Sequence, residues 1–202
     1  QYRYEHQPAV VVATKVGRDS RLYPDHYTKE RVRANIAGSA ARLGVETLDL
    51  VQLHCVPLAV LKAGELLGWM EDFQAAGLIR AFGASVETLE EALELVTHPG
   101  LTSLQIIFNL FRQNAIDALF PLAQANEVGI IARLPLASGV LSGKMRHGQS
   151  FAESDHRHYN SRGEVFSQGE TFSGLPFDQA IDRVEEIRGW VPAGMSMAQM
   201  AM

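Results

Sequence analysis

The sequence predicts an α/β fold built on a parallel sheet, because short β-branched apolar runs alternate with longer runs of helical periodicity. Five runs are predicted to be strands: residues 9–17, 47–55, 79–86, 103–111 and 129–137. Helical patterns separate them along the chain. A strand followed by a helix and then by another strand implies parallel pairing with right-handed crossovers.

Cap residues predict several helix ends. Gly44 and Gly77 each follow an apolar helical pattern, where glycine commonly ends a helix. Thr88 and Glu91 have the spacing of a capping box. Ser196 is placed to begin a last helix.

Composition favours one globular domain spanning residues 1–202, of which 47% are hydrophobic. Cys55 is the single cysteine, which excludes an internal disulfide and fits a reducing compartment. No run is long and apolar enough to span a bilayer, and the first ten residues lack a signal-peptide pattern. A net charge of −5 without a basic face argues against nucleic acid as a partner. We therefore expect a cytoplasmic protein that does not bind membranes.

Residues 146–175 are predicted to form a long loop within this domain, because they are rich in Gly, Ser, Arg and His and lack apolar periodicity. The histidines in it are His147, His156 and His158. Two histidines one residue apart hint at a metal, but no acidic residue or cysteine has a suitable spacing. We expect surface histidines and no metal site.

Polar residues stand at or near the carboxyl end of every predicted strand: Lys15, His54, Ser85, Gln105 with Asn109, and Arg133. Taken singly, the histidine could be a satisfied core residue, the lysine could extend to solvent, and the arginine could pair with a carboxylate. In a closed barrel and in an open doubly wound sheet alike, this edge builds the binding site. Their shared position therefore favours one functional site.

The segment "PLASGVLSGK", residues 135–144, follows the fifth strand as a loop of small residues. Gly139 and Gly143 would let the backbone approach a ligand closely. Exposed amides together with Lys144 would suit a phosphate or pyrophosphate. The segment is neither a GxGxxG nor a Walker motif.

Five segments together resemble the aldo-keto reductase family, and most closely its bacterial oxidoreductases. They are "VVVATKVG", "LDLVQLHCVP", "GLIRAFGASV", "SLQIIFNLFRQ" and "GIIARLPLASGVLSGK", in the family's order and spacing. The resemblance implies a (β/α)8 TIM barrel that binds NADPH, with NADH possible, and reduces a small aldehyde or ketone by hydride transfer. Such barrels usually need about 250 residues. We therefore expect an incomplete barrel of about five βα units, the long loop and terminal helices, without the family's first strands and last strand.

The resemblance also implies roles for individual residues. Lys15 matches the lysine that lowers the pKa of the family's catalytic tyrosine, and His54 matches the histidine that orients the substrate carbonyl. Ser85 and Gln105 match positions that hold the nicotinamide carboxamide. The residues that match the loop over the cofactor pyrophosphate are Leu136, Ser138, Gly139 and Leu141, with Lys144 at its end.

Some positions depart from the family pattern. Val86 stands where an asparagine is common, and Arg133 stands where a tyrosine often stacks on the nicotinamide. The arginine plane could stack likewise or pair with the cofactor phosphates. The family's aspartate and tyrosine precede the first matched strand, and Tyr2 and Tyr4 lack their sequence context.

Two other functions stay open at this point. One is a nicotinamide-binding module that senses redox state or serves as a subunit, with little turnover. The other is a lyase or aldolase in which Lys15 forms a Schiff base. The sequence carries no readable preference for one carbonyl substrate.

Overall fold

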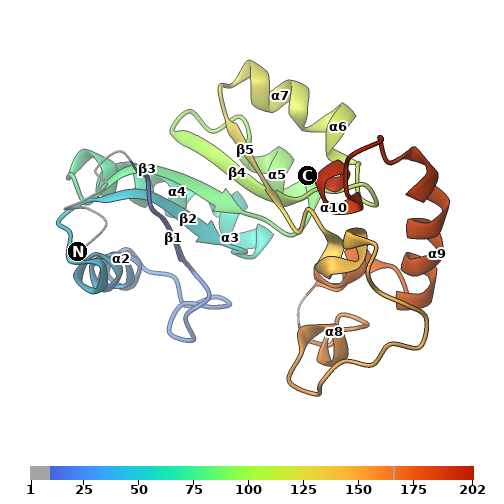
Figure 1. Ribbon diagram of the computed structural model, residues 1–202. Helices are drawn as coiled ribbons and strands as arrows, with labels where there is room; N and C mark the ends of the chain where they lie inside the picture. The colour runs from blue at the N-terminus through green and yellow to red at the C-terminus, as the bar shows by residue number, and fades with distance from the viewer. Residues whose placement is uncertain (1–9, 166) are drawn as a thin grey trace. The chain divides into compact units, whose positions relative to one another are not determined.

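The computed structural model describes residues 10–165 and 167–202, and in them a single sheet runs in the order β1-β2-β3-β4-β5 (Figure 1). The strands are β1 Ala13–Val16, β2 Leu48–His54, β3 Ile79–Ser85, β4 Leu101–Ile107 and β5 Gly129–Arg133. Register shows that β1 with β2, β2 with β3, and β3 with β4 pair in parallel. Sequence neighbours are therefore sheet neighbours, and the predicted parallel sheet is confirmed.

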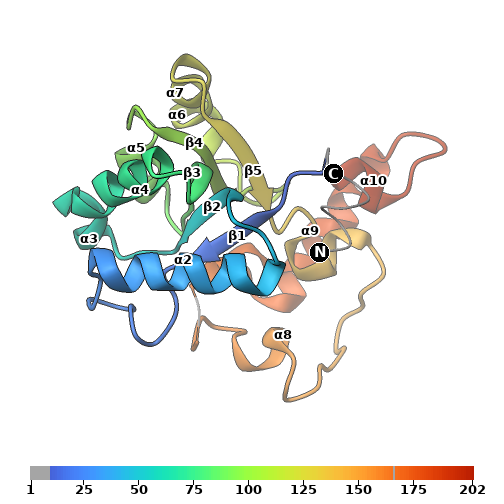
Figure 2. The ribbon, with the colours of Figure 1, turned by 90° about the vertical axis from the view of Figure 1, so that its left-hand side faces the viewer.

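Helices that alternate with the strands cover one face of this sheet. In the described ranges the helices are α2 Lys29–Leu43, α3 Leu58–Ala63, α4 Glu65–Ala75, α5 Leu89–Leu95, α6 Ala115–Ala118, α7 Phe120–Ala125, α8 His156–Tyr159, α9 Phe177–Ile187 and α10 Met197–Ala201, of which α8 to α10 follow the last strand. Figure 2 shows α2, α4 and α5 arranged along the same side of the strands. The strand residues facing them, including Val51, Phe82 and Leu104, are fully buried. No helix within the described ranges is both long and apolar enough to cross a membrane.

The predicted helix ends are confirmed where caps can be checked. Gly44 adopts φ +68° after α2, and its N–H donates to the last turn. Thr88 and Glu91 form both hydrogen bonds of a capping box at the start of α5. Ser196 begins α10 through a second capping box with Gln199.

All five strands are shorter than the sequence predicts, and the first, fourth and fifth differ from it most at one end. The first run gives a strand from Ala13, and Ala9 lies outside the described residues. The N–H of Val12 donates to the side chain of Asp49 at 2.9 Å instead of to a strand neighbour.

The fourth and fifth runs end early because the backbone turns. Asn109 forms an isolated antiparallel bridge with Arg112, so β4 stops at Ile107. Leu134 has φ +55°, outside the strand region, so β5 stops at Arg133. Pro135 follows and has no N–H to continue a ladder.

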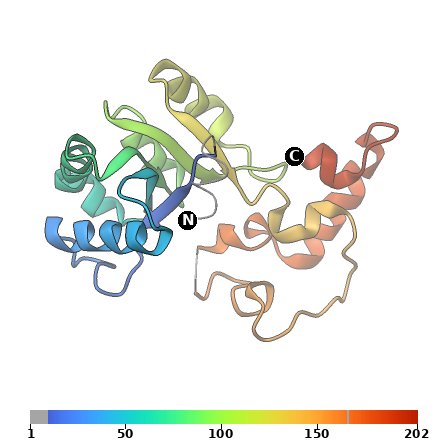
Figure 3. The same cartoon turned by 60° about the vertical axis from the view of Figure 1, so that its left-hand side comes forward.

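The chain divides into two compact units. Of the described residues, unit 1 comprises 10–106 and 116–131, and unit 2 comprises 107–115, 132–165 and 167–202. Unit 2 has an apolar cluster of its own, with Val140, Phe172 and Ile181 at its centre. Within it, α9 and α10 pack beside the Ala137–Ser142 turn (Figure 3). The segment 146–175 contains α8 and two short 3-10 turns, Gln168–Glu170 and Phe172–Gly174.

Candidate active site

The parallel register of unit 1 puts four predicted site residues on one face of the sheet. His54 pairs with Ser85, and Ser85 pairs with Gln105. Lys15 pairs with Gln52, which lies two residues before His54 and therefore on the same face. This face is the one opposite the helices. The sequence prediction that strand ends bring these side chains together is consistent with this register.

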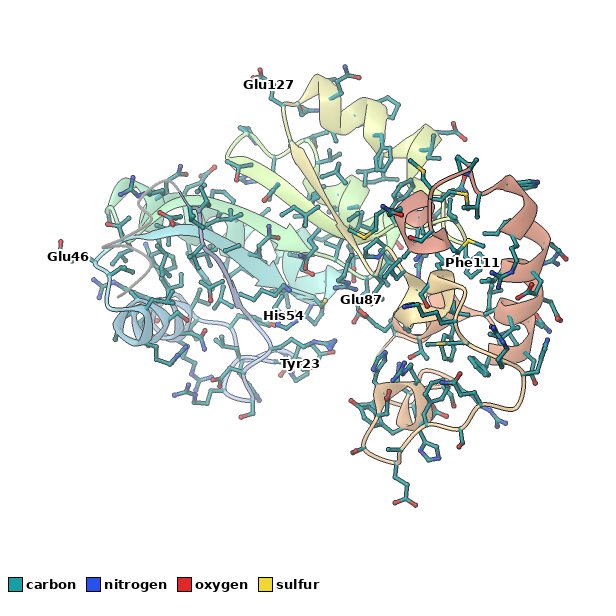
Figure 4. The ribbon with its side chains drawn as sticks, viewed as in Figure 1. Tyr23, Glu46, His54, Glu87, Phe111 and Glu127 are labelled. Carbon is teal, nitrogen blue, oxygen red and sulfur yellow. The ribbon has the colours of Figure 1, made fainter. Side chains whose placement is uncertain are left out.

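The four side chains differ in exposure. Lys15 is exposed, His54 and Gln105 are half-buried, and Ser85 is 1% exposed. The Nζ of Lys15 has no hydrogen-bond or ion-pair partner among residues 10–165 and 167–202. Figure 4 shows His54 and Glu87 at one end of the strands of unit 1 and Glu46 and Glu127 at the other. An exposed cation and a half-buried imidazole thus stand at the carboxyl edge.

Ser85 and Gln105 form a polar pair of the kind that could hold a carboxamide. The Ser85 hydroxyl donates to Oε1 of Gln105 at 3.1 Å. The Gln105 amide nitrogen has no partner in the described part of the chain. A carboxamide needs one donor and one acceptor, and this pair offers an amide N–H beside a hydroxyl oxygen. The residues present therefore fit the amide end of a nicotinamide.

The sequence reasoning missed a second polar pair on the same face. Gln52 Nε2 donates to Ser103 Oγ at 2.9 Å, and both residues are buried. Gly83 lies between them in the register, and a Cβ there would stand only 2.3 Å from Ser103 Oγ. Gln52 could have been identified from the sequence, because it lies two residues before His54 in the same strand and therefore on the same face.

The ends of β1 and β2 approach each other closely. Gly17 has φ +131°, and a Cβ on it would lie 3.3 Å from the backbone nitrogen of His54. The hydroxyl of Tyr27 donates to the Gly17 carbonyl at 2.8 Å. Burial raises the pKa of Tyr27 to about 12. A glycine at this position therefore allows the backbone to support the histidine.

An ion pair joins the segments that follow β1 and β3. Arg18 Nη2 lies 3.2 Å from Glu87 Oε1, and the Arg18 guanidinium carbon lies 4.9 Å from the ring centre of Tyr23. Because β2 lies between β1 and β3, this pair ties the two segments on either side of the strand that carries His54.

Unit 2 carries the remaining predicted residues, beginning with Arg133. Its guanidinium pairs with the carboxylate of Glu170, and both side chains are mostly buried, at 15% and 20% exposure. Of the interpretations that the sequence left open for Arg133, the structure thus shows pairing with a carboxylate. Its partner is 37 residues further along the chain, where no local pattern indicated it.

The loop after β5 has the backbone conformation expected of a tight ligand-binding turn. Ser138 and Gly139 adopt φ values of +57° and +93° inside the Ala137–Ser142 turn. Leu136 precedes the turn and is half-buried, whereas Leu141 is fully buried. Lys144 is exposed, and no ion pair is found for it in the described residues. The N–H groups of Ala137, Gly139, Leu141 and Gly143 donate to carbonyls of the same loop, so Lys144 is the group that this loop most clearly offers to a ligand.

Other predicted features lie elsewhere. Val86 is buried and donates its N–H to the Gln105 carbonyl, so its side chain belongs to the core. Tyr2 and Tyr4 lie outside the described residues. His147 contacts Asp178 and Asp182 at 3.1 Å each. No cluster of three or more His, Cys, Asp or Glu residues that could hold a metal occurs within the described ranges.

Comparison with known proteins finds similar sequences and similar solved structures. The sequence model of the aldo/keto reductase family matches residues 3–202. The aldo-keto reductase YhdN of Bacillus subtilis (strain 168) is 27% identical over 162 residues, which cover 79% of this chain and 48% of that protein. The NADH-specific methylglyoxal reductase of Escherichia coli (strain K12) is 28% identical over 131 residues, or 64% of this chain and 40% of that protein. A solved glycerol dehydrogenase from Gluconobacter oxydans aligns with a TM-score of 0.70 and 26% identity, over 95% of this chain and 58% of that chain.

The chain therefore belongs to the aldo/keto reductase family, whose members are oxidoreductases that act on carbonyl groups with nicotinamide cofactors. The chain spans about half the length of the curated relatives it matches. Its five-stranded parallel sheet is part of the family's (β/α)8 barrel, which confirms the predicted fold class.

Proposed function

We propose that this protein is an NADPH-dependent oxidoreductase that reduces a small aldehyde or ketone to an alcohol. The observation that carries the proposal is the shared sheet face of Lys15, His54, Ser85 and Gln105 at the carboxyl edge of unit 1. Barrel enzymes build their active sites at this edge. When bound, the cofactor supplies a hydride to the carbonyl carbon.

Each residue has a distinct task in this proposal. The charge of Lys15 favours proton transfer to the developing alkoxide, and His54 orients the carbonyl by hydrogen bonding. Ser85 and Gln105 hold the carboxamide. Arg133 at the end of β5 contributes to the cofactor site, as do Leu136, Ser138, Gly139 and Leu141 in the loop that follows, and Lys144 supplies a cation for the cofactor phosphates.

The cofactor is proposed to be NADPH, with NADH as the second choice. One relative is described as NADH-specific, so family membership leaves the choice open. We further propose a cytoplasmic location, because the single cysteine, Cys55, is free and buried.

A second candidate function is a nicotinamide-binding redox sensor or subunit with little turnover. The specific observation in its favour is that Val86 and Arg133 stand where the family commonly has a contact asparagine and a stacking tyrosine. Such a protein would bind NADPH tightly yet reduce no carbonyl compound.

The test is Lys15→Met measured against Lys62→Met, which removes an exposed lysine paired only with Glu90. Turnover of NADPH with a panel of aldehydes and ketones is expected to fall at least about a hundredfold in Lys15→Met, because positioned acid–base groups contribute on that scale. The Kd for NADPH should change less than about threefold in both variants, because Lys15 is proposed to act on the carbonyl and not to bind the cofactor. Retained turnover in Lys15→Met would contradict the role given to this lysine.

A further inference from the structure

A pocket with a volume of about 280 Å³ lies in unit 2, between α8 and the first residue of α9 (Figure 1). The residues that line it all belong to segment 149–177, so the pocket lies within one unit. None of them is a residue assigned above to the catalytic or cofactor site. A cavity of about 150 Å³ holds benzene, and larger ligands occupy about 300 Å³ or more. The volume therefore suits a single ring that carries a small substituent.

Three phenylalanine rings form the apolar wall of this pocket. The ring centre of Phe172, which is 1% exposed, lies 5.0 Å from that of Phe177 and 6.0 Å from that of Phe151. The rings of Phe151 and Phe177 meet edge to face at 5.3 Å. Both line the pocket and are only half-buried, so they keep open ring surface there. Such surface favours a further aromatic ring, because rings attract each other in edge-to-face and offset arrangements.

Arg157 forms the charged side of the pocket. Its guanidinium carbon lies 4.5 Å from the ring centre of Phe151, and its Nε and Nη2 donate to the Asp155 carboxylate at 2.9 and 2.5 Å. These contacts fix the plane of the guanidinium but use only one of its edges. In the part of the chain that the structure describes, Nη1 has no acceptor. The edge formed by Nη1 and Nη2 is thus open to a second carboxylate, which an arginine binds through two parallel hydrogen bonds.

The rim of the pocket is polar and offers hydrogen-bond donors. The side chains that complete it are exposed, and each can donate a hydrogen bond: Gln149, Ser150, His158 and Ser161. Within the described ranges, no aspartate or glutamate lines the pocket. An anion there would therefore meet donors and a cation, whereas a positively charged ligand would be repelled by Arg157.

We propose that this pocket is a ligand site separate from the candidate active site, and that it takes an aromatic carboxylate. The ring would pack on Phe151 and Phe177, and the carboxylate would accept from the open edge of Arg157. The inference is independent of the proposed function, since it uses neither the cofactor nor a catalytic residue. Benzoate is the simplest member of this ligand class and serves as the probe.

The experiment measures the Kd of benzoate by ligand-observed NMR titration for the unmodified protein, Ser161→Trp and Ser154→Trp. Ser161 is exposed and lines the pocket, so an indole at this position occupies the ligand space without entering the core. Ser154 is an exposed serine of the same segment outside the pocket lining, and it provides the matched control. We expect Ser161→Trp to weaken benzoate at least about tenfold, because a small ligand that loses the contacts of a few atoms loses that much affinity. Ser154→Trp should change the Kd less than about twofold, as exposed sites away from a ligand do.

The ligand class is tested by changing the ligand. Benzamide keeps the ring and lacks the charge, whereas cyclohexanecarboxylate keeps the charge and lacks the aromatic face. Each should bind at least about fivefold more weakly than benzoate, because each gives up one of the two recognised groups.

Arg157→Lys tests the open edge of the guanidinium. Lysine keeps the charge and can still pair with Asp155, but it has no planar pair of donors. Benzoate should bind about tenfold more weakly to this variant, the scale of a lost charge-assisted hydrogen bond. Circular dichroism shows whether the variant folds, and Ser161→Trp carries the test if it does not.

Several results would overturn the inference. One is an unchanged Kd in Ser161→Trp. Another is loss of benzoate binding in Lys15→Met or its displacement by saturating NADPH, since benzoate would then occupy the candidate active site. A third is no binding up to about 10 mM benzoate, where even a millimolar site is mostly filled. A protein that failed to reduce any carbonyl compound would refute the proposed function and leave these titrations unaffected.

Discussion

The two groups of candidate residues are held in place by different means. In unit 1, Lys15, His54 and Ser85 sit where the parallel register of adjacent strands puts them, and their backbones belong to the sheet ladder. In unit 2, Arg133 and Ser138 are held by residues 170–173, here called the strap: Arg133 pairs with the Glu170 carboxylate, and the Ser138 hydroxyl donates to the Glu170 carbonyl and accepts from the Phe172 N–H. The first group depends on strand pairing, whereas the second depends on a few side-chain contacts.

Because of this difference, the two regions respond differently to mutation. A sheet position is supported by many backbone hydrogen bonds, so it is disturbed chiefly by changes that push strands apart. A strap position depends on one or two polar side chains, so the loss of a single amide can release it. Mutations can therefore distinguish the two regions.

Gly83→Ala should give the largest effect and tests the sheet. A Cβ at Gly83 would stand 2.3 Å from Ser103 Oγ and 2.4 Å from the Ser103 carbonyl oxygen, so β3 and β4 must separate. We expect the free energy of unfolding to fall by about 3 kcal/mol, the upper range for overpacking. Urea denaturation measures it.

The matched control for that change is Gly68→Ala. Gly68 lies inside α4, and a Cβ on it would meet nothing within 4 Å. Alanine there should raise the stability by about 0.5–1 kcal/mol through helix propensity. A Gly83→Ala protein as stable as the unmodified one would mean that the Gln52–Ser103 pair does not set the strand spacing.

Asn109→Ala should give a smaller effect and tests the strap. Its amide donates to Leu134 O at 2.9 Å and Ser173 Oγ at 2.7 Å, and its oxygen accepts from the Phe111 N–H at 3.0 Å. Because Asn109 is only 4% exposed, these groups lose partners that water replaces poorly, and we expect a loss of about 2 kcal/mol. Thermal or urea unfolding gives the value.

Asn126→Ala is the control for the strap, since Asn126 makes one exposed bond to Leu122 O. It should change the stability by less than about 0.5 kcal/mol, as exposed sites usually do. Equal losses of stability at positions 109 and 126 would mean that the hydrogen bonds of Asn109 hold the strap no more firmly than an exposed hydrogen bond such as that of Asn126.

Tyr27 gives the smallest effect and concerns pH. Burial raises its pKa to about 12 from the value near 10 of an unfolded chain. The folded state therefore holds this proton more tightly, and the resulting stabilisation is complete below pH 10 and is lost as pH rises from 10 to 12. Absorbance titration should show one tyrosine fewer ionising near pH 10 than in the unfolded chain. In Tyr27→Phe this late ionisation should be absent, and its persistence there would assign it to another tyrosine.

Regular features were predictable from the sequence because they depend on local chemistry. The strand that contains His54 was recognisable from its apolar run, and the capping box at Thr88 from the three-residue spacing to Glu91. Strand ends were less predictable. Leu134 takes a positive φ that nothing in its own side chain favours, so β5 ends before the apolar run does.

The candidate site was likewise predictable where it depends on strand ends, and not where it depends on contacts between distant segments. His54 and Ser85 followed from strand ends that must meet at one sheet edge. The partner of Arg133 could not be found in this way, because Glu170 belongs to a segment without apolar periodicity and reaches the arginine only through the tertiary fold. Gln52 was missed because its neighbours made it read as part of a buried strand.

The most direct test of carbonyl reduction is deuterium transfer from NADPH labelled at the transferable C4 position. The protein would be incubated with labelled cofactor and an aldehyde panel, and the alcohol products analysed by mass spectrometry. The proposal predicts one deuterium on the former carbonyl carbon of at least one product, and much less product from Lys15→Met under the same conditions. Tight NADPH binding without label in any product would contradict it and favour the cofactor-binding module.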